Sequence, residues 1–285
     1  MKKQPCSAVH QNPGYPKSIL KTVVILLVSL FFISGLGMLF VPQPASGNEK
    51  NLYVLAESFT WKEFSGNETL LKESGPRYGI GFSGNVGGNP SQPFAFHYKV
   101  EGYFGYIEYD GQTQDGTPVT TDTRYLGLKT ELGLGWKIFI GESGFSFEPL
   151  AGLGYRWWLR DITDAGSGVG LGYEEMWRSY YGRLGLRGEK SISDQFKMFM
   201  EAAAIIPFYN QNMVNLGWFG LGKITVEPGN ENSFCAEAGF KFKKLRFSVF
   251  YEGLRFSESD KEGLFQFYQP ESEADSYGVT IGLAF

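Results

Sequence analysis

The stretch that decides the fold is DSYGVTIGLAF, residues 275–285. From Tyr277 onwards, large apolar residues alternate with Gly, Thr or Ala, and the stretch ends on Phe285. A period of two is typical of a β-strand that has one apolar face. The terminus of a soluble domain is usually frayed and polar. This segment is instead predicted to be a strand held between neighbours that the rest of the chain must supply.

Ten strand-like segments follow one another, and the connectors between them alternate in length. The predicted strands are 51–64, 77–87, 93–109, 122–139, 145–161, 174–189, 195–208, 232–243, 246–257 and 275–285. The short connectors are 88–92, 140–144, 190–194 and 244–245, and the long ones are 65–76, 110–121, 162–173, 209–231 and 258–274. Short turns on one side and long loops on the other are typical of a transmembrane β-barrel. Residues 213–226 are predicted to belong to a hairpin in a large loop, turned at 227–230.

The two faces of each predicted strand differ in polarity. In FAFHYKVEG (94–102), Phe94 and Phe96 share one face, whereas His97 and Lys99 share the other. A membrane barrel turns the apolar face to lipid and the charged face to the lumen, whereas a soluble sandwich does the reverse. Periodicity alone leaves both open.

Aromatic residues favour the membrane barrel. One set falls near the short turns: Phe94, Phe96, Trp136, Phe145, Phe147, Phe196, Phe240, Phe242, Phe247 and Phe285. A second set falls near the long loops: Trp61, Tyr106, Tyr109, Tyr155, Trp157 and Trp177. Two aromatic belts separated by aliphatic residues are typical of two membrane interfaces.

In its last strand the chain resembles the outer-membrane β-barrel proteins of Gram-negative cells as a class. Their final strand ends in Phe, has apolar or aromatic residues at alternate positions, and is the signal read by the barrel assembly machinery. The matching residues are Tyr277, Val279, Ile281, Leu283 and Phe285. The resemblance implies that the assembly machinery is a partner during insertion. It also implies that outer-membrane lipid and lipopolysaccharide surround the protein in the outer membrane.

The predicted fold class is therefore all-β, an antiparallel up-and-down transmembrane barrel of about ten strands, with eight or twelve as alternatives. In the first strand, Glu57 favours an inward position whereas Phe59 and Trp61, of the same parity, favour an outward one. We expect a β-bulge between Glu57 and Phe59 to resolve the conflict. Pro149 lies inside a strand and predicts a second irregularity.

The first 47 residues differ from the rest. Four lysines, an apolar run at 22–40 and the exit VPQPASG (41–47) occur in that order. This order predicts a signal peptide at 1–47 with a helical core, followed by the barrel at 48–285. An uncleaved anchor is the alternative, because the run could span a membrane. Removing 1–47 removes four lysines and no acid, so the net charge falls from −4 to −8, which argues against a nucleic-acid partner.

The inward faces carry charges of both signs at similar depths. The residues predicted to form a lumenal network are Lys99, Glu101, Lys129, Glu131, Arg183, Glu201, Glu237 and Glu252. A ten-strand barrel is narrow enough to be filled by side chains, so we expect the charges to pair and close the lumen. Inward glycines, among them Gly81, Gly127 and Gly154, are expected to make room for long side chains opposite. A narrow solute or ion channel, porin-like, is the alternative function.

Catalysis is not expected, although an outer-membrane hydrolase is a second alternative. Residues 48–285 contain one histidine, His97, and its parity places it in the lumen near the short turns. The outer-membrane proteases and lipid hydrolases that the class includes would need a histidine at the outer rim or facing lipid. No cofactor is predicted, and the acidic loops match no metal-binding spacing. The predicted role is structural or surface interaction in the cell envelope, with no surface ligand identified.

The assembly signal yields a test. Replacing Phe285 by Ala removes the terminal aromatic group that the class resemblance assigns to recognition. The folded, heat-modifiable species in the outer membrane should fall, whereas export of the chain should be unchanged. Fractionation followed by gel electrophoresis with and without heating measures both. Unchanged amounts of folded barrel would contradict the assigned role.

Overall fold

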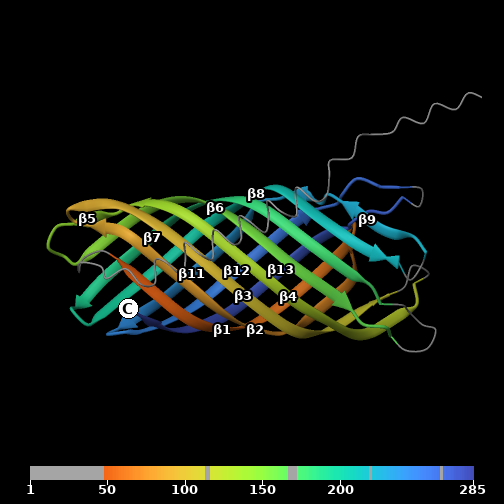
Figure 1. Cartoon of the computed structure of the whole chain (residues 1–285), viewed down its shortest axis with the longest axis horizontal. Helices are drawn as coiled ribbons and strands as arrows, with labels where there is room; N and C mark the ends of the chain where they lie inside the picture. Colours follow the sequence, from red (N-terminus) through yellow and green to blue (C-terminus); the bar gives the residue numbers. More distant parts are fainter. Residues whose placement is uncertain (1–47, 113–115, 166–171, 218–219, 264–265) are drawn as a thin grey trace, which may run out of the picture. The chain divides into compact units, whose positions relative to one another are not determined.

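The computed structural model describes residues 48–112, 116–165, 172–217, 220–263 and 266–285, and these form a closed antiparallel β-barrel (Figure 1). The strands of the ten-strand wall are β1 (Glu49–Ser65), β2 (Glu68–Asn89), β3 (Gln92–Gln112), β4 (Pro118–Trp136), β6 (Phe145–Ile162), β7 (Glu174–Ser193), β8 (Phe196–Leu216), β11 (Ser233–Phe242), β12 (Leu245–Ser257) and β13 (Glu271–Ala284). Three short strands complete the sheet: β5 (Ile138–Ile140), β9 (Gly222–Val226) and β10 (Gly229–Asn230). Among the described residues, no helix is long and apolar enough to cross a membrane.

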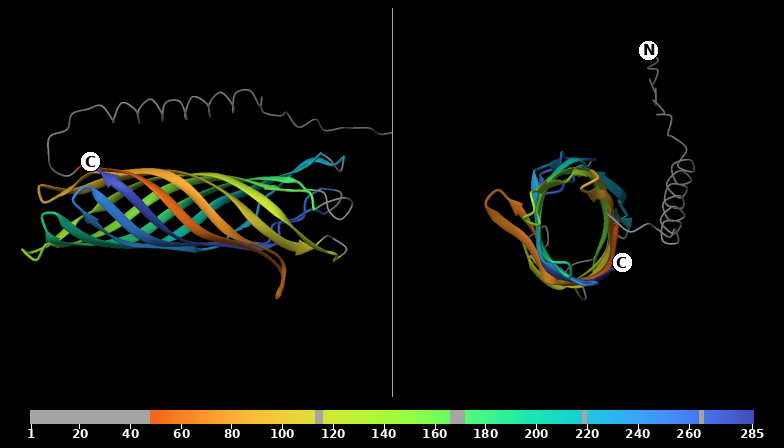
Figure 2. Two further views of the ribbon diagram at one scale, coloured as in Figure 1. Left: turned by 90° about the horizontal axis from the view of Figure 1, so that it is seen from below. Right: turned by 90° about the vertical axis from the view of Figure 1, so that its left-hand side faces the viewer.

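The barrel closes where the sequence predicts, between the first strand and the last. β1 pairs with β13 from Asn51 opposite Ala284 to Phe64 opposite Glu271, and β13 also pairs with β12. Viewed along its axis, the wall forms a ring (Figure 2). Closure matters because an open sheet edge within lipid would leave backbone N–H and C=O groups without partners.

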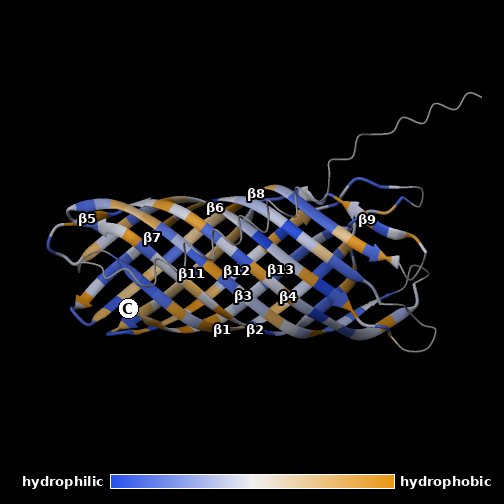
Figure 3. Ribbon diagram, viewed as in Figure 1, coloured by the Kyte–Doolittle hydropathy of each residue, from blue (hydrophilic) through white to orange (hydrophobic). Residues whose placement is uncertain are grey.

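Side chains alternate between the outer wall and the lumen. On β1, Leu52 and Val54 are 48% and 57% exposed, whereas Tyr53 and Leu55 are 5% and 4% exposed. The alternation of apolar and polar residues is visible along the strands in Figure 3. The exposed apolar side chains form a band around the barrel, which we call the apolar band. Exposing this apolar surface to water would cost free energy. The band therefore marks the segment that contacts the hydrocarbon of the membrane.

Three of the aromatic residues assigned to the loop-side belt were placed wrongly. Trp61, Tyr109 and Trp177 are buried inside the barrel, at 1%, 7% and 0% exposure. They keep the parity of the inward residues on their strands. The outward aromatic residues near the loops include Tyr78, Phe104, Tyr106, Tyr155, Trp157, Tyr180, Phe208 and Tyr277.

The bulge predicted between Glu57 and Phe59 is absent. The pairing of β1 with both neighbours is continuous from Glu57 to Trp61, and a register shift towards β2 occurs only between Glu63 and Phe64. The conflict disappears because Phe59 and Trp61 point into the lumen together with Glu57. At this depth the lumen is filled by aromatic rings, so an inward aromatic residue is favourable.

The irregularity predicted at Pro149 takes the form of a break in the ladder. β4 pairs with β6 as far as Gly135 opposite Leu150, and β5 resumes with Ile138 opposite Phe147 in the same register. Pro149 lies opposite the interruption, where its missing N–H costs no hydrogen bond.

The loops differ from the predicted ones because the strands extend further. β1 and β2 continue to a two-residue turn at Gly66 and Asn67, within the segment predicted as a loop. The hairpin predicted at 213–226 is present as β8 and β9, but the chain reverses between Leu216 and Gly222 instead of at 227–230. At Gly229 and Asn230 the chain passes to pair with β12. The connectors predicted at 65–76 and 209–231 are therefore largely continuations of strands.

Inward glycines make room for tyrosine rings on neighbouring strands, as predicted. A Cβ atom at Gly81, Gly127 or Gly154 would lie 2.1 or 2.2 Å from the ring of Tyr53, Tyr103 or Tyr181, respectively. All three tyrosines are buried. Each glycine therefore forms the seat of a ring that fills the lumen.

Gly127→Ala should destabilise the barrel, because its Cβ would collide with the ring of Tyr103. We expect a loss of about 1–3 kcal/mol, the usual range for overpacking. Gly182→Ala is the matched control, since the atom nearest to its added Cβ is 3.9 Å away. Heat-modifiability midpoints on gels measure both, and equal midpoints would contradict the packing argument.

Candidate functional site: the charged lumen and its aromatic closure

The eight residues of the predicted network all point into the lumen and most are joined by ion pairs. Lys129 Nζ lies 2.5 Å from Glu252 Oε2 and 3.7 Å from Glu131 Oε1. Arg183 bridges the two carboxylates of Glu131, at 3.3 Å, and Glu201. These contacts join strands far apart in the sequence, so the charges link opposite parts of the wall.

The remaining predicted residues form smaller groups beside this chain of ion pairs. Lys99 Nζ lies 3.0 Å from Glu101, which also accepts a hydrogen bond of 2.8 Å from the Tyr53 hydroxyl. Glu237 pairs at 3.2 Å with Arg246, a residue outside the predicted network. In such a confined space each carboxylate is stabilised by the cation paired with it. A buried charge without a partner would lower the stability of the barrel.

An ion pair that the sequence did not predict lies on the loop side of the network. Arg77 is 2.6 Å from Glu57, and its guanidinium stacks 3.6 Å from the ring centroid of Phe59 and 4.4 Å from that of Tyr103. Arg77 shares the parity of Gly81, which the sequence predicts to face the lumen, so parity alone could have placed it.

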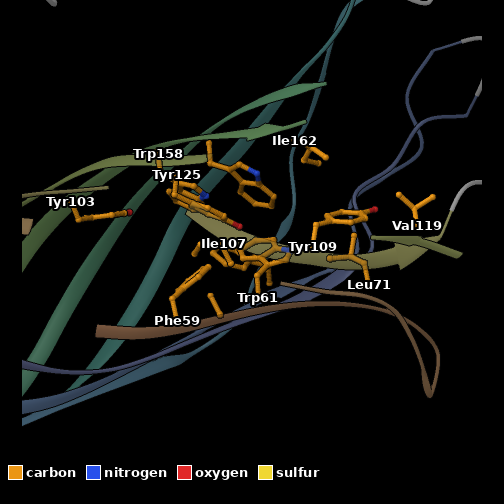
Figure 4. Close-up of a cluster of buried hydrophobic side chains, with 13 residues drawn as sticks. Phe59, Trp61, Leu71, Tyr103, Ile107, Tyr109, Val119, Tyr125, Trp158 and Ile162 are labelled. Carbon is orange, nitrogen blue, oxygen red and sulfur yellow. The ribbon is translucent and has the colours of Figure 1, made fainter. Parts of the chain in front are cut away.

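Towards the loops, the lumen is closed by a layer of aromatic rings. Trp158 and Trp177 stack with centroids 5.1 Å apart, and Trp61 meets Trp177 edge-on at 5.1 Å. Phe256 packs against all three tryptophans. Figure 4 shows Phe59, Trp61, Tyr125 and Trp158 converging from the wall. We call this group the aromatic layer: Phe59, Trp61, Tyr103, Ile107, Tyr125, Trp158, Trp177 and Phe256, all buried in one cluster.

Next to the aromatic layer, three carboxylates are paired with a single arginine. Arg160 is completely buried, and its guanidinium lies 3.1 Å from Glu63, 2.9 Å from Glu73 and 2.9 Å from Glu175. Arg160 has the parity of the inward residues of β6, but parity identifies none of these partners. We call the four residues the Arg160 cluster.

Neighbouring side chains complete the hydrogen bonding of the Arg160 cluster. Trp61 Nε1 donates to Glu63 at 2.9 Å, and Trp177 Nε1 donates to Glu175 at 2.9 Å. Glu73 accepts from the hydroxyls of Tyr125 and Thr123, the latter at 2.8 Å. The tryptophans of the aromatic layer are thus tied to the arginine through the carboxylates.

The Arg160 cluster lies beyond the apolar band, on the loop side. The outward residues beside its members are polar, as at Lys62, Lys72 and Asp161. Burial raises the pKa of Glu63, and the neighbouring carboxylates Glu175 and Glu73 act in the same direction, against the opposing effect of Arg160. At Glu63, the guanidinium of Arg160 therefore does not fully offset burial and the neighbouring carboxylates.

Two cavities in the lumen extend from the short turns to mid-depth, where one of them reaches Arg77 and Tyr103. These cavities, of about 160 and 180 Å³, share lining residues, including Asn85, His97, Arg187 and Arg246. A third cavity, bordered by Phe59, Trp61 and Trp158, holds only about 10 Å³. A space of that size is at the lower limit for one water molecule. The lumen is therefore a blind well that ends at the aromatic layer.

His97 lies in the well, as its parity predicts. Its Nε2 is 2.7 Å from Glu148 Oε1, and Glu148 is buried behind it. In the described part of the chain, no group of three or more His, Cys, Asp or Glu side chains is arranged to hold a metal ion.

A closed barrel with an apolar outer band and a charged lumen defines an integral outer-membrane β-barrel protein. The family model of the autotransporter beta-domain matches residues 81–252. This is more than half of the sequence, and the chain belongs to the autotransporter beta-domain family. No curated protein sequence matches it.

Three solved structures of outer-membrane proteins are similar to this chain, and one of them has a TM-score above 0.5. The outer membrane protease OmpT from Escherichia coli matches with a TM-score of 0.52 at 12% identity, covering 86% of this chain and 98% of that chain. The transport unit of the autotransporter AIDA-I from Escherichia coli gives 0.42 at 10%, covering 87% and 94%. The translocator domain of NalP from Neisseria meningitidis gives 0.39 at 9%, covering 94% and 96%. At 12% identity, the likeness to the outer membrane protease concerns the fold alone.

Arg160→Met should destabilise the barrel strongly, because three buried carboxylates lose their shared cation. We expect a loss of about 3–5 kcal/mol at neutral pH, typical of a broken buried ion pair. Arg178→Met, on the outer wall of β7, is the control and should change stability little. Thermal unfolding of the purified barrels compares the two.

Acidification should partly restore the stability of the Arg160→Met variant. Carboxylates without a cation have raised pKa values in the folded state, so that state binds more protons than the unfolded one. The lost stability should therefore return as the pH falls towards the ordinary carboxyl range. A variant equally unstable at pH 5 and pH 8 would contradict the electrostatic account.

Proposed function

We propose that this protein is a non-conducting, non-catalytic barrel of the outer membrane that acts through its outer surfaces, in a structural or surface-interaction role. The observation that carries the proposal is the closure of the lumen by the aromatic layer and the Arg160 cluster. Both lie between the blind well and the loops, and both are held by buried, hydrogen-bonded side chains.

A narrow channel is the first alternative, and the structure favours it less. The cavities of the lumen end on the short-turn side of Trp61 and Trp158. The charged residues around them form ion pairs with one another. A conducting pore needs a continuous polar path and sites that release the ion again. Opening such a path would require several tryptophan rings to move together.

Movement of a polypeptide through this lumen meets the same obstacle. Two of the structural neighbours are described as a transport unit and a translocator domain. An extended chain would have to displace the aromatic layer and the mid-lumen ion pairs. For the barrel as described, we therefore place the role at its surface.

A hydrolase is the second alternative, suggested by the protease among the neighbours. The support for a non-catalytic role is the position of His97, which is paired with Glu148 inside the well, on the side of the short turns. A surface substrate on the loop side would be separated from it by the aromatic layer. We further propose that the assembly machinery and the lipids of the outer membrane are its partners.

Planar-bilayer recordings test the closed lumen. The unmodified barrel should show no steady current, and a variant carrying Trp61→Ala and Trp158→Ala should conduct, because it opens the aromatic layer. Trp157→Ala is the matched control, since Trp157 is the neighbouring residue on the outer wall. Arg183→Ala with Glu201→Ala should remain closed, because those residues lie below the layer.

Two results would replace the proposal with an alternative. A steady ion-selective current from the unmodified barrel would establish the channel. Cleavage of a reporter ester or peptide by the unmodified barrel, abolished by His97→Ala, would establish the hydrolase.

A further inference from the structure

The lumenal cavity nearest to the short turns is lined by more cations than carboxylates. Its volume is about 180 Å³, whereas one water molecule needs roughly 10–15 Å³. Five lysine or arginine side chains line it, against three glutamates. The cavity therefore has room for a small molecule and favours one that carries negative charge.

Three of these cations form one row across neighbouring strands. Lys197 on β8 lies opposite Lys241 on β11, and Lys241 lies opposite Arg246 on β12. All three side chains line the cavity. Like charges directly opposite each other are destabilising in a sheet, so the row gains stability from any anion placed over it.

Carboxylates of the chain itself supply only part of that negative charge. Lys241 Nζ lies 2.7 Å from Glu49 Oε2, and Arg246 Nη2 lies 3.2 Å from Glu237 Oε1. Lys197 is exposed and has no ion-pair partner within the described ranges of the chain. An ammonium group has three N–H donors and a guanidinium has five. All three side chains therefore keep donors for a ligand.

An aromatic ring holds the arginine of the row in place. The Arg246 guanidinium lies 4.1 Å from the ring centroid of Phe199, and the Arg187 guanidinium lies 5.5 Å from the same centroid. Phe199 itself lines the cavity. Stacking of this kind orders a guanidinium before any ligand binds, which reduces the entropy cost of binding.

Solvent reaches the row from the side of the short turns. The side chains of Lys241 and Glu49 are 26% and 32% exposed. In outer-membrane barrels the short turns face the periplasm. The aromatic layer closes the opposite end of the lumen, so a ligand would enter and leave on the periplasmic side.

We propose that Lys197, Lys241 and Arg246 bind the phosphate group of a soluble periplasmic compound. A phosphate monoester carries a charge of about −1.5 to −2 at pH 7 and three strong acceptor oxygens, and these suit donors that converge from three strands. A carboxylate presents only two oxygens in one plane. A phospholipid would have to withdraw its acyl chains from the membrane to place its headgroup inside the lumen. The inference goes beyond the proposed function and needs neither the closed loop side nor a surface partner.

Isothermal titration calorimetry of the detergent-purified protein tests the assignment. The probe is glycerol 3-phosphate, and the comparison compounds are inorganic phosphate, succinate and a short-chain phosphatidic acid. Ionic strength is held constant, because salt screens exposed charges. We expect one equivalent of glycerol 3-phosphate to bind, at least tenfold more tightly than succinate or the phosphatidic acid, with inorganic phosphate also bound.

Lys197→Gln should weaken the binding of glycerol 3-phosphate at least tenfold, because it removes the cation that has no carboxylate partner. Lys244→Gln is the matched control. Lys244 lies in the turn between β11 and β12, so its replacement removes the same charge on the same side, but Lys244 does not line the cavity. The control should bind as tightly as the unmodified protein.

Glu49→Gln should have the opposite effect and tighten binding severalfold, because Lys241 loses the carboxylate that competes with the ligand. Glu142→Gln is its control, since Glu142 lies in the turn between β5 and β6 and does not line the cavity. Heat-modifiability confirms that each variant is folded. The gain expected from Glu49→Gln keeps the proposal testable if Lys197→Gln does not fold.

Four outcomes would overturn the proposal. They are the absence of saturable binding by either phosphate compound, equal effects of Lys197→Gln and Lys244→Gln, tighter binding of succinate, and tighter binding of the phosphatidic acid. The second would show unspecific attraction to the rim, and the last two would assign the row to a carboxylate or a lipid headgroup. The variant with Trp61→Ala and Trp158→Ala should still bind glycerol 3-phosphate whether or not it conducts, so this proposal and the closed lumen fail separately.

Discussion

The structure depends on a closed antiparallel ladder that satisfies the backbone within the membrane. Each wall strand is paired on both sides, and β13 returns to β1. Once the ladder closes, the period of two sends every second side chain to lipid and every other one to the lumen. The apolar band, the charged well and the aromatic layer are three consequences of that one constraint.

The lumen is organised by depth. Near the short turns the charges line open cavities, at mid-depth they pair across the space, and towards the loops tryptophan rings replace them. The Arg160 cluster then ends the series with a buried cation that three carboxylates share. Closure on the loop side uses both packing and charge, and the indole N–H groups connect the two.

Strand number, closure and the inward position of the network residues could be predicted from alternation and connector length. The partners of Arg160 could not, because parity gives the side of the wall but not which residues meet across the lumen. Glu73 was also hidden in a segment predicted as a loop, since β2 continues beyond the membrane. The prediction for Trp61 was wrong because aromatic rings fill the lumen at its depth, and the parity that Trp61 shares with Glu57 places it there.

The Arg160 cluster also bears on the order of folding. Its members come from β1, β2, β6 and β7, so the cluster requires both halves of the wall to be curved towards each other. A half-built sheet would hold the same carboxylates on an open concave surface, where water can solvate them. The stabilising contacts then appear together at a late stage, after non-local strands have met. Closure of the barrel is therefore cooperative, because an incomplete sheet has not yet gained these stabilising contacts.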